Sequence, residues 1–249
     1  MIKIALCAFN ETQSLEKLLT NISHELQNLK ENFEIIICLD GTTDNSAEII
    51  KKFNSTSILP LRNERGLGLA FKRVFLEIIK NSTDEDLVIS LDADNTHDAR
   101  QFTQMLKYFN DNNLDILVAS RFSNKSISKS FPKYRQLISK SVSIVLQTLF
   151  PIKKINGLKL QDYTSGYRIY KAKKLKELFK LQQDNFITEP EFTYTCELLI
   201  KLSRIDCRID ETAIFYNYDE KIGVSKLRIT RNFLRLVALI GKLFYNKKL

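Results

Sequence analysis

Short apolar runs alternate with helical patterns through the first 120 residues, and this alternation constrains the fold more than any other feature of the sequence. The apolar runs predict buried strands at residues 2–9, 33–39, 57–61, 87–91 and 115–119. Helical patterns fall between them, at residues 15–29, 47–53, 66–79 and 102–109. Because strands that alternate with helices favour βαβ units, the pattern predicts an α/β fold with a mostly parallel sheet flanked by helices.

The pattern loosens after Arg121. Residues 123–132 are polar and predict a mobile loop, and residues 162–170 are rich in turn formers. Further elements are expected as helices at 134–150, around Leu175 and at 193–202, and as a strand near 208–216. We therefore predict one α/β domain over residues 1–225 with a helical extension over residues 226–249.

Composition is that of an ordinary globular protein, with one local bias. The formal net charge is +9, but residues 226–249 hold seven Lys and Arg and no acid. Taking those seven from the 38 basic residues leaves 31 against 29 acidic residues in the rest of the chain. The basic bias therefore belongs to the tail. No motif of nucleic-acid recognition accompanies it, so we expect no nucleic-acid partner.

The sequence disfavours a membrane-spanning protein, a secreted protein and a protein built on disulfides or a His-rich metal site. No run approaches 18 apolar residues, and the N-terminus lacks a signal-peptide pattern, so we expect a cytoplasmic location. The four cysteines have no C-x-x-C spacing and are interpreted as small buried hydrophobic residues in a reducing compartment. Two histidines make a His-rich metal site improbable.

Polar residues follow three of the predicted strands. They are Asn10-Glu11, Asp40-Gly41 and the triplet from Asp92 to Asp94. In a parallel sheet the ligand lies outside the carboxyl ends of the strands, so these side chains should converge on one edge.

The glycines discriminate between nucleotide-binding folds. The first glycine is Gly41, so the first strand is followed by neither G-x-G-x-x-G nor a P-loop. Phosphates would then be held through a metal ion. Mg²⁺ and Mn²⁺ prefer carboxylate oxygens and complete their shell with water and substrate phosphate. Asp92 and Asp94 are the candidate ligands, although an Asp-x-Asp pair alone is a weak signal.

Seven motifs in order resemble family 2 glycosyltransferases of the GT-A fold, near the dolichol-phosphate mannosyltransferase branch. The resemblance covers residues 1 to about 230 and rests on C-A-F-N-E (7–11), L-D-G-T-T-D (39–44), R-G-L-G-L-A (65–70), L-D-A-D-N-T-H (91–97), A-S-R (119–121), D-Y-T-S-G-Y-R (162–168) and Y-D-E-K-I-G-V-S-K (218–226). Cys7 and Leu39 depart from the usual proline and aspartate. Thr96 replaces a glutamine of some relatives, which implies weaker metal binding.

The resemblance implies a role for each site residue. Nucleotide contacts are expected from Phe9, Glu11, Asp40, Asp92 and Ala93. Metal binding is expected from Asp94 directly and from Asp92, which contacts ribose or a metal-bound water. His97 orders the metal loop or only caps the next turn, and both readings stay open.

Further roles concern the leaving group and the acceptor. Arg121 suits the leaving diphosphate, since its guanidinium matches phosphate oxygens. Catalytic roles are also implied for Asp162, Arg168 and Lys226, and acceptor contacts for Arg135, Ser165 and Lys226. Gly166 is expected to give the Thr-Ser-Gly turn a special backbone shape. Glu197 is either near the acceptor or a half-exposed helix acid.

The implied activity is an inverting transfer from a GDP- or UDP-linked sugar with Mg²⁺ or Mn²⁺. The positively charged residues on the acceptor side favour a polyprenyl phosphate acceptor. A phosphate is already anionic and needs only cations to hold it, whereas a hydroxyl needs a general base. The alternatives are a sugar hydroxyl, with Asp162 or Glu197 as base, and a non-catalytic nucleotide-sugar-binding relative.

The tail predicts an amphipathic helix with basic and apolar faces. The basic face holds Arg228, Arg231, Arg235 and Lys242. Such a helix either lies peripherally on the cytoplasmic face of a membrane or packs on the protein core, and both readings stay open.

Overall fold

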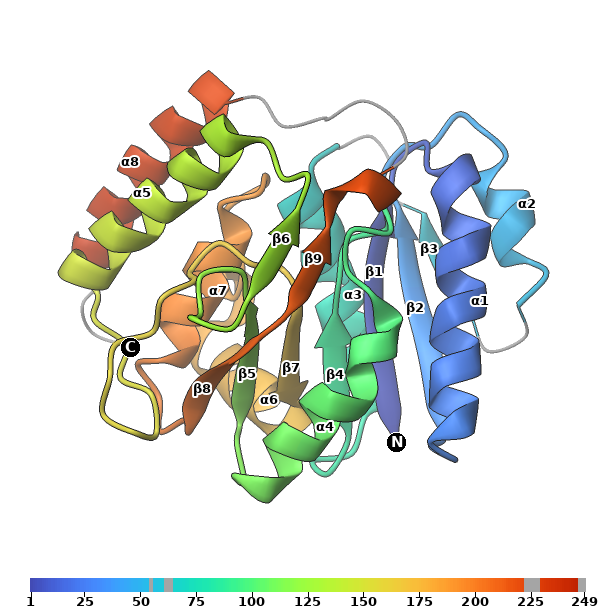
Figure 1. Ribbon diagram of the computed structural model, residues 1–249, viewed down its shortest axis with the longest axis horizontal. Helices are drawn as coiled ribbons and strands as arrows, with labels where there is room; N and C mark the ends of the chain where they lie inside the picture. The colour runs from blue at the N-terminus through green and yellow to red at the C-terminus, as the bar shows by residue number, and fades with distance from the viewer. Residues whose placement is uncertain (54–55, 61–64, 222–228, 246–249) are drawn as a thin grey trace.

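The computed structural model describes residues 1–53, 56–60, 65–221 and 229–245. Within this part of the chain a seven-stranded sheet forms the centre of the molecule (Figure 1). Its spatial order is β3-β2-β1-β4-β7-β5-β8. The strands are β1 (Ile2–Ala8), β2 (Phe33–Leu39), β3 (Thr56–Pro60), β4 (Leu87–Ser90), β5 (Ile116–Ser120), β7 (Arg168–Lys171) and β8 (Ile209–Ala213).

Parallel pairing confirms the predicted mostly parallel sheet. β1 lies between β2 and β4 and is parallel to both, and β5 is parallel to β8. The exception is β7, which is antiparallel to both β4 and β5. Residues 162–170 were expected only as a turn-rich segment, and the strand β7 at its end was not predicted. β7 has only four residues and directly follows a run of turn formers, so its pattern is too short to be read from sequence.

Helices cover both faces of the sheet. Alternate residues of β1 point to opposite faces, as a strand requires: Ile4 and Leu6 join one core, whereas Ala5 and Cys7 join the other. The first core packs under α1 (Thr12–Asn28) and α4 (Phe102–Asp111). The second includes buried residues of α3 (Leu67–Asn81), α6 (Ala172–Gln182) and α7 (Tyr194–Leu202). A short helix, α2 (Ser46–Ile50), follows β2.

A small second sheet lies beside the carboxyl edge of the large one. β6 (Ile127–Lys129) pairs in parallel with β9 (Phe215–Asn217). The segment 123–132 therefore contains a strand where a loop was expected. The predicted strand near 208–216 divides, since β8 belongs to the large sheet and β9 to the small one.

Two long helices, α5 (Lys133–Leu149) and α8 (Ile229–Tyr245), lie side by side at one end of the molecule (Figure 1). Leu146 of α5 and Leu236 of α8 belong to the same core, and the rings of Phe150 and Phe244 are 5.0 Å apart. The expected domain boundary at 225/226 falls among residues 222–228, which lie outside the described part. The packing nevertheless joins α8 to the main core.

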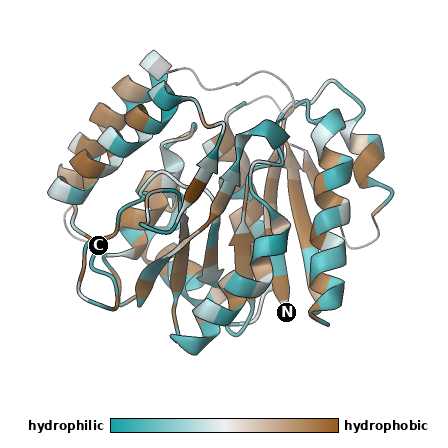
Figure 2. Cartoon of the chain, viewed as in Figure 1, coloured by the Kyte–Doolittle hydropathy of each residue, from teal (hydrophilic) through white to brown (hydrophobic). Residues whose placement is uncertain are grey.

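Both helices also carry hydrophobic residues on their outer surfaces (Figure 2). Leu137 of α5 and Leu234 of α8 are 67% and 69% exposed. Among the helices described, none is long and apolar enough to cross a membrane.

Candidate active site

A cavity of about 700 Å³ lies where the carboxyl ends of the strands meet the helices α5 and α8. Strand-end residues provide one wall, including Phe9, Asp92 and Arg121. The two helices provide another, largely apolar wall, which includes Ile138, Val142, Phe233 and Leu236. The cavity therefore joins a polar end to an apolar end.

The acidic pair follows β4 in a tight loop. Asp94 Oδ1 accepts hydrogen bonds from the backbone N–H of Thr96 at 3.2 Å and from its hydroxyl at 2.6 Å. Asn95 has a positive φ of 63°, and its side chain donates to the carbonyl of Ser14 at 2.8 Å. An asparagine tolerates this left-handed backbone better than most residues. The loop thus fixes Asp94 through its neighbours, and Thr96 orients the carboxylate.

His97 orders the same loop through a hydrogen bond with its backbone. Its Nδ1 accepts the backbone N–H of Asp92 at 3.0 Å, and its ring stacks on Tyr167 with centroids 5.0 Å apart. Burial lowers the pKa of His97 against the opposing effect of the two aspartates. Of the two roles left open for His97, the structure favours the ordering of the metal loop.

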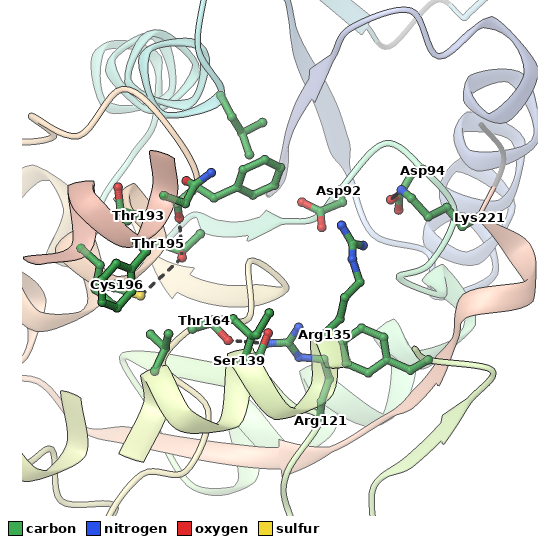
Figure 3. A pocket seen from close by; sticks show the side chains of 18 of the residues that line it. Asp92, Asp94, Arg121, Arg135, Ser139, Thr164, Thr193, Thr195, Cys196 and Lys221 are labelled. Carbon is green, nitrogen blue, oxygen red and sulfur yellow. Dashed lines mark hydrogen bonds and ion pairs between the residues drawn. The ribbon is translucent and has the colours of Figure 1, made fainter. Parts of the chain in front are cut away.

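Lys221 is a site residue that the sequence analysis missed. Its ammonium forms an ion pair with Asp94 Oδ2, and it lines the cavity (Figure 3). The only sequence signal was a lysine inside the motif 218–226. Burial would raise the pKa of Asp94, but Lys221 and Thr96 outweigh it and lower that pKa. Burial raises the pKa of Asp92, and the negative charge of Asp94 adds to the increase.

Asp92 and Asp94 fit a site for a hard divalent cation whose remaining ligands are water and substrate phosphate. Among the described residues, no group of three or more His, Cys, Asp or Glu side chains is arranged to hold a metal alone. Mg²⁺ and Mn²⁺ commonly bind one or two carboxylates together with water and substrate phosphate. Asp94 and Asp92 supply such a carboxylate pair at the cavity wall.

The predicted nucleotide-side residues gather at this edge, but they do not all face the cavity. Phe9, Glu11 and Ala93 line it, and the guanidinium of Arg65 stacks 3.6 Å from the Phe9 ring. Asp40 is not among the described residues that line the cavity. Both of its carboxylate oxygens accept the backbone N–H of Gly66 at 3.1 Å.

Asp44 ties the first two strand-end loops together. Its carboxylate accepts the backbone N–H of Thr12 at 3.0 Å and the hydroxyl of Ser46 at 2.6 Å. Burial opposes ionisation, but these hydrogen bonds dominate and lower the pKa of Asp44 to about 2. Asp44, in the motif 39–44, therefore positions the loop that carries Glu11.

Asp162 fixes the guanidinium of Arg121. Nε and Nη2 of Arg121 each donate to one carboxylate oxygen of Asp162 at 2.9 Å, and Nη2 also donates to Thr164 at 2.6 Å. The Asp162 side chain is fully buried. Burial would raise the pKa of Asp162, but Arg121 outweighs it and lowers that pKa. A carboxylate held in this way positions an arginine and is a weak general base.

Two residues expected near the acceptor, Arg168 and Ser165, lie elsewhere. Arg168 is fully buried, and its guanidinium donates to the carbonyls of Thr195 and Tyr163 at 2.7 and 2.9 Å. Ser165 is also buried, and its hydroxyl accepts the backbone N–H of Tyr167. Neither is among the described residues that line the cavity. Both are buried and hold the turn 162–168 through hydrogen bonds with its backbone.

Gly166 and Glu197 also differ from expectation. Gly166 is not among the described residues with positive φ, and a Cβ there would lie 3.5 Å from Asp92 Oδ1, an ordinary van der Waals distance, so the special backbone shape expected for it is not observed. Glu197 is buried and pairs with Lys201 at 2.6 Å while it accepts the backbone N–H groups of Thr188 and Glu189. It is a structural acid rather than a base for the acceptor.

Arg135 alone among the predicted acceptor residues reaches the cavity in the described chain. It projects from α5 toward the acidic pair (Figure 3), and its Nη1 donates to the hydroxyl of Tyr218 at 2.8 Å. Lys226 lies outside the described residues. The sequence analysis also missed Tyr218 and Phe131, which are aromatic lining residues with no charge pattern to mark them.

Curated relatives share part of their length with this chain. It is 28% identical over 169 residues to the dolichol-phosphate mannosyltransferase of Pyrococcus furiosus, which covers 67% of this chain and 45% of the relative. It is 25% identical over 242 residues to the dodecaprenyl-phosphate galacturonate synthase of Rhizobium johnstonii, covering 95% and 64% respectively. The chain thus spans about half to two thirds of these relatives.

Solved structures share the fold at low identity. Glucosyl-3-phosphoglycerate synthase from Mycobacterium tuberculosis, solved with Mg²⁺ and uridine diphosphate, superposes with a TM-score of 0.63 at 16% identity over 97% of this chain and 78% of that one. Residues 1–349 of S. aureus TarS give 0.60 at 16% identity over 98% and 65%. The fold is therefore GT-A, as the sequence motifs implied.

The sequence profile described as glycosyl transferase family 2 matches residues 3–179, which is more than half of the chain. This segment includes the acidic pair, Arg121 and the turn that holds Asp162. The chain belongs to glycosyl transferase family 2.

Proposed function

We propose that this protein transfers a sugar from a nucleoside-diphosphate sugar to a polyprenyl phosphate, with inversion at the sugar carbon. The observation that carries the proposal is the composition of the cavity. An acidic pair and the cations Arg121, Arg135 and Lys221 line the same space as the apolar faces of α5 and α8. A lipid phosphate needs this combination of charge and apolar surface. The names of the two curated relatives, each a prenyl-phosphate sugar enzyme, support the same acceptor class.

The donor would lie against the strand ends. Asp94 and Asp92 would hold Mg²⁺ or Mn²⁺, which supplies neutralisation of the diphosphate charge. Arg121 is held by Asp162 and lines the cavity. A guanidinium fixed in advance stabilises a leaving diphosphate without reorganisation when the bond breaks. The base of the nucleotide, guanine or uracil, stays open.

The carboxylates favour an acceptor that needs no base. Asp162 is committed to Arg121, and Glu197 is buried against Lys201. Both were the candidate bases for a sugar hydroxyl. A phosphate oxygen attacks as an anion, so Arg135 and its neighbours need only hold it. Attack from the side opposite the diphosphate gives inversion in a single displacement.

The outer faces of α5 and α8 support peripheral contact with the cytoplasmic side of an anionic membrane. Neither segment contains Asp or Glu, and both carry Lys or Arg. Exposed apolar residues of the two helices include Leu137, Ile144, Leu234 and Val237. Basic and apolar side chains on one surface bind lipid headgroups and the acyl boundary together. The acceptor phosphate would reach the cavity from this surface.

The experiment offers a donor with either a short polyprenyl phosphate or the matching polyprenol. Transfer to the phosphate alone is expected. Arg135→Ala should reduce transfer by roughly tenfold or more, about 1.4 kcal/mol per decade. Lys107→Ala, which removes an exposed lysine of α4, is the control and should have little effect. Transfer to the polyprenol or to free sugars would contradict the proposal, and donor binding without any transfer would favour a binding protein.

A further inference from the structure

Lys221 engages the same carboxylate that a metal ion would use. Its ammonium pairs with Oδ2 of Asp94, while Oδ1 of Asp94 is held by Thr96. Only 14% of the Lys221 side chain and 15% of the Asp94 side chain are exposed. The pair is therefore poorly screened by water, and a second cation at Asp94 would be repelled by the first.

Asp92 is not restrained in this way. Its side chain is 34% exposed, and Oδ2 lies 3.9 Å from His97 Nδ1, which already accepts a backbone N–H. The two carboxylates are thus unequal: one is open to the cavity, whereas the other carries a cation from the chain itself.

We propose that Lys221 is an exchangeable cation of the donor site, which a divalent metal displaces from Asp94. The inference rests on the proposed donor, since it assigns this lysine to the diphosphate region of the same site. The displaced ammonium stays within the cavity, because Lys221 is one of its lining residues together with Arg121 and Arg135. Metal entry would therefore add a free positive charge where the diphosphate lies.

The segment that carries Lys221 has other anchors. Lys17 pairs with Glu220, Lys129 pairs with Asp219 at 2.9 Å, and Arg135 donates to Tyr218. Loss of the Lys221–Asp94 pair should therefore leave the segment in place. Exchange of the lysine does not require the chain around it to unfold.

The test measures Mn²⁺ binding to the full chain by calorimetry, without donor or acceptor. Lys221→Met removes the competing charge, so its dissociation constant for Mn²⁺ should fall at least fivefold below that of the wild type. Lys221→Arg keeps a cation and should stay within about twofold of the wild type. Lys17→Met is the matched control, because it removes an equal charge from an ion pair between α1 and Glu220, next to Lys221.

An unchanged or weaker Mn²⁺ affinity in Lys221→Met, with native circular dichroism, would overturn the exchange. So would an equal gain in Lys17→Met, since the effect would then be one of net charge. Catalysis that proceeds in excess chelator with no Mn²⁺ binding would also overturn it, because Lys221 would then be a permanent cation. These results do not depend on the acceptor, so transfer to polyprenyl phosphate can fail or succeed separately.

Discussion

The strand-end side of the cavity and its helical side are built in different ways. At the strand ends each key side chain is held by defined partners: Thr96 holds Asp94, Gly66 holds Asp40, and Asp162 holds Arg121. On the helical side, the cavity is lined by apolar side chains that are exposed by half or more, such as Phe233 and Leu234 of α8. One side fixes charges in space, and the other offers a surface with few directional contacts.

This difference matches the two kinds of substrate in the proposed reaction. A diphosphate develops charge at fixed atoms, so prepositioned groups stabilise it best. A polyprenyl chain offers only apolar area, which a non-directional surface can bind. Substitutions on the two sides should therefore lower different properties. At the strand ends they should lower catalysis or stability, and on the helices they should weaken membrane binding.

The largest expected effect is on the acidic pair. Asp94→Asn keeps the shape of the side chain but removes the charge that binds a metal ion or Lys221. Sugar transfer should fall by roughly a hundredfold or more, about 2.7 kcal/mol in the barrier. Steady-state transfer assays with Mn²⁺ measure it, alongside a thermal melt to show that the variant is folded. Activity within threefold of the wild type would place the metal elsewhere.

The stability of the fold should be nearly as sensitive to a substitution at a close backbone contact on the strand-end side. A Cβ at Gly68 would lie 2.0 Å from the carbonyl oxygen of Glu189, so Gly68→Ala forces the start of α3 away from the loop before α7. We expect a loss of about 2 kcal/mol in the free energy of unfolding, within the range for overpacking. Urea denaturation measures it. Gly241→Ala, where a Cβ meets no described atom within 4 Å, is the control.

On the helical side the effect should appear in membrane binding and leave stability unchanged. Leu137→Ser combined with Val237→Ser removes two exposed apolar side chains that do not line the cavity. Binding to vesicles that contain anionic lipid should weaken by about tenfold, because roughly 1.4 kcal/mol of apolar burial is lost. Co-sedimentation at low and high salt measures it. Equal retention of both proteins would show that this surface does not bind membranes.

The smallest effect is the pH dependence due to Asp44. Its folded-state pKa of about 2 lies below the usual value of 3.8, so ionised Asp44 stabilises the fold. That stabilisation is fully present above about pH 4 and is lost as the pH falls toward 2. After allowance for solvent screening it amounts to about 1 kcal/mol. Asp44→Asn should lower stability at pH 7 and flatten the acid limb of the unfolding curve. An acid limb identical to that of the wild type would remove Asp44 as its source.

Local sequence determined the framework and the charged edge. The segments at β1, β2 and β4 are nearly continuous apolar runs, as buried parallel strands are, and in a parallel sheet their ends must lie at one edge. This is why Asp92, Asp94, Phe9 and Glu11 could be placed together from sequence. The motifs added Arg121 and Asp162, whose ion pair the structure describes.

Only the tertiary structure decided which polar residues face the cavity. Arg168 and Ser165 belong to the same motif as Asp162, but both are buried and form hydrogen bonds with backbone groups of the protein. Glu197 has an ion-pair partner one helical turn away, and burial makes that pair structural. Lys221 reaches Asp94 across 127 residues of chain. A motif shows which residue types are present, whereas the direction of each side chain and its distant partners depend on how the whole chain packs.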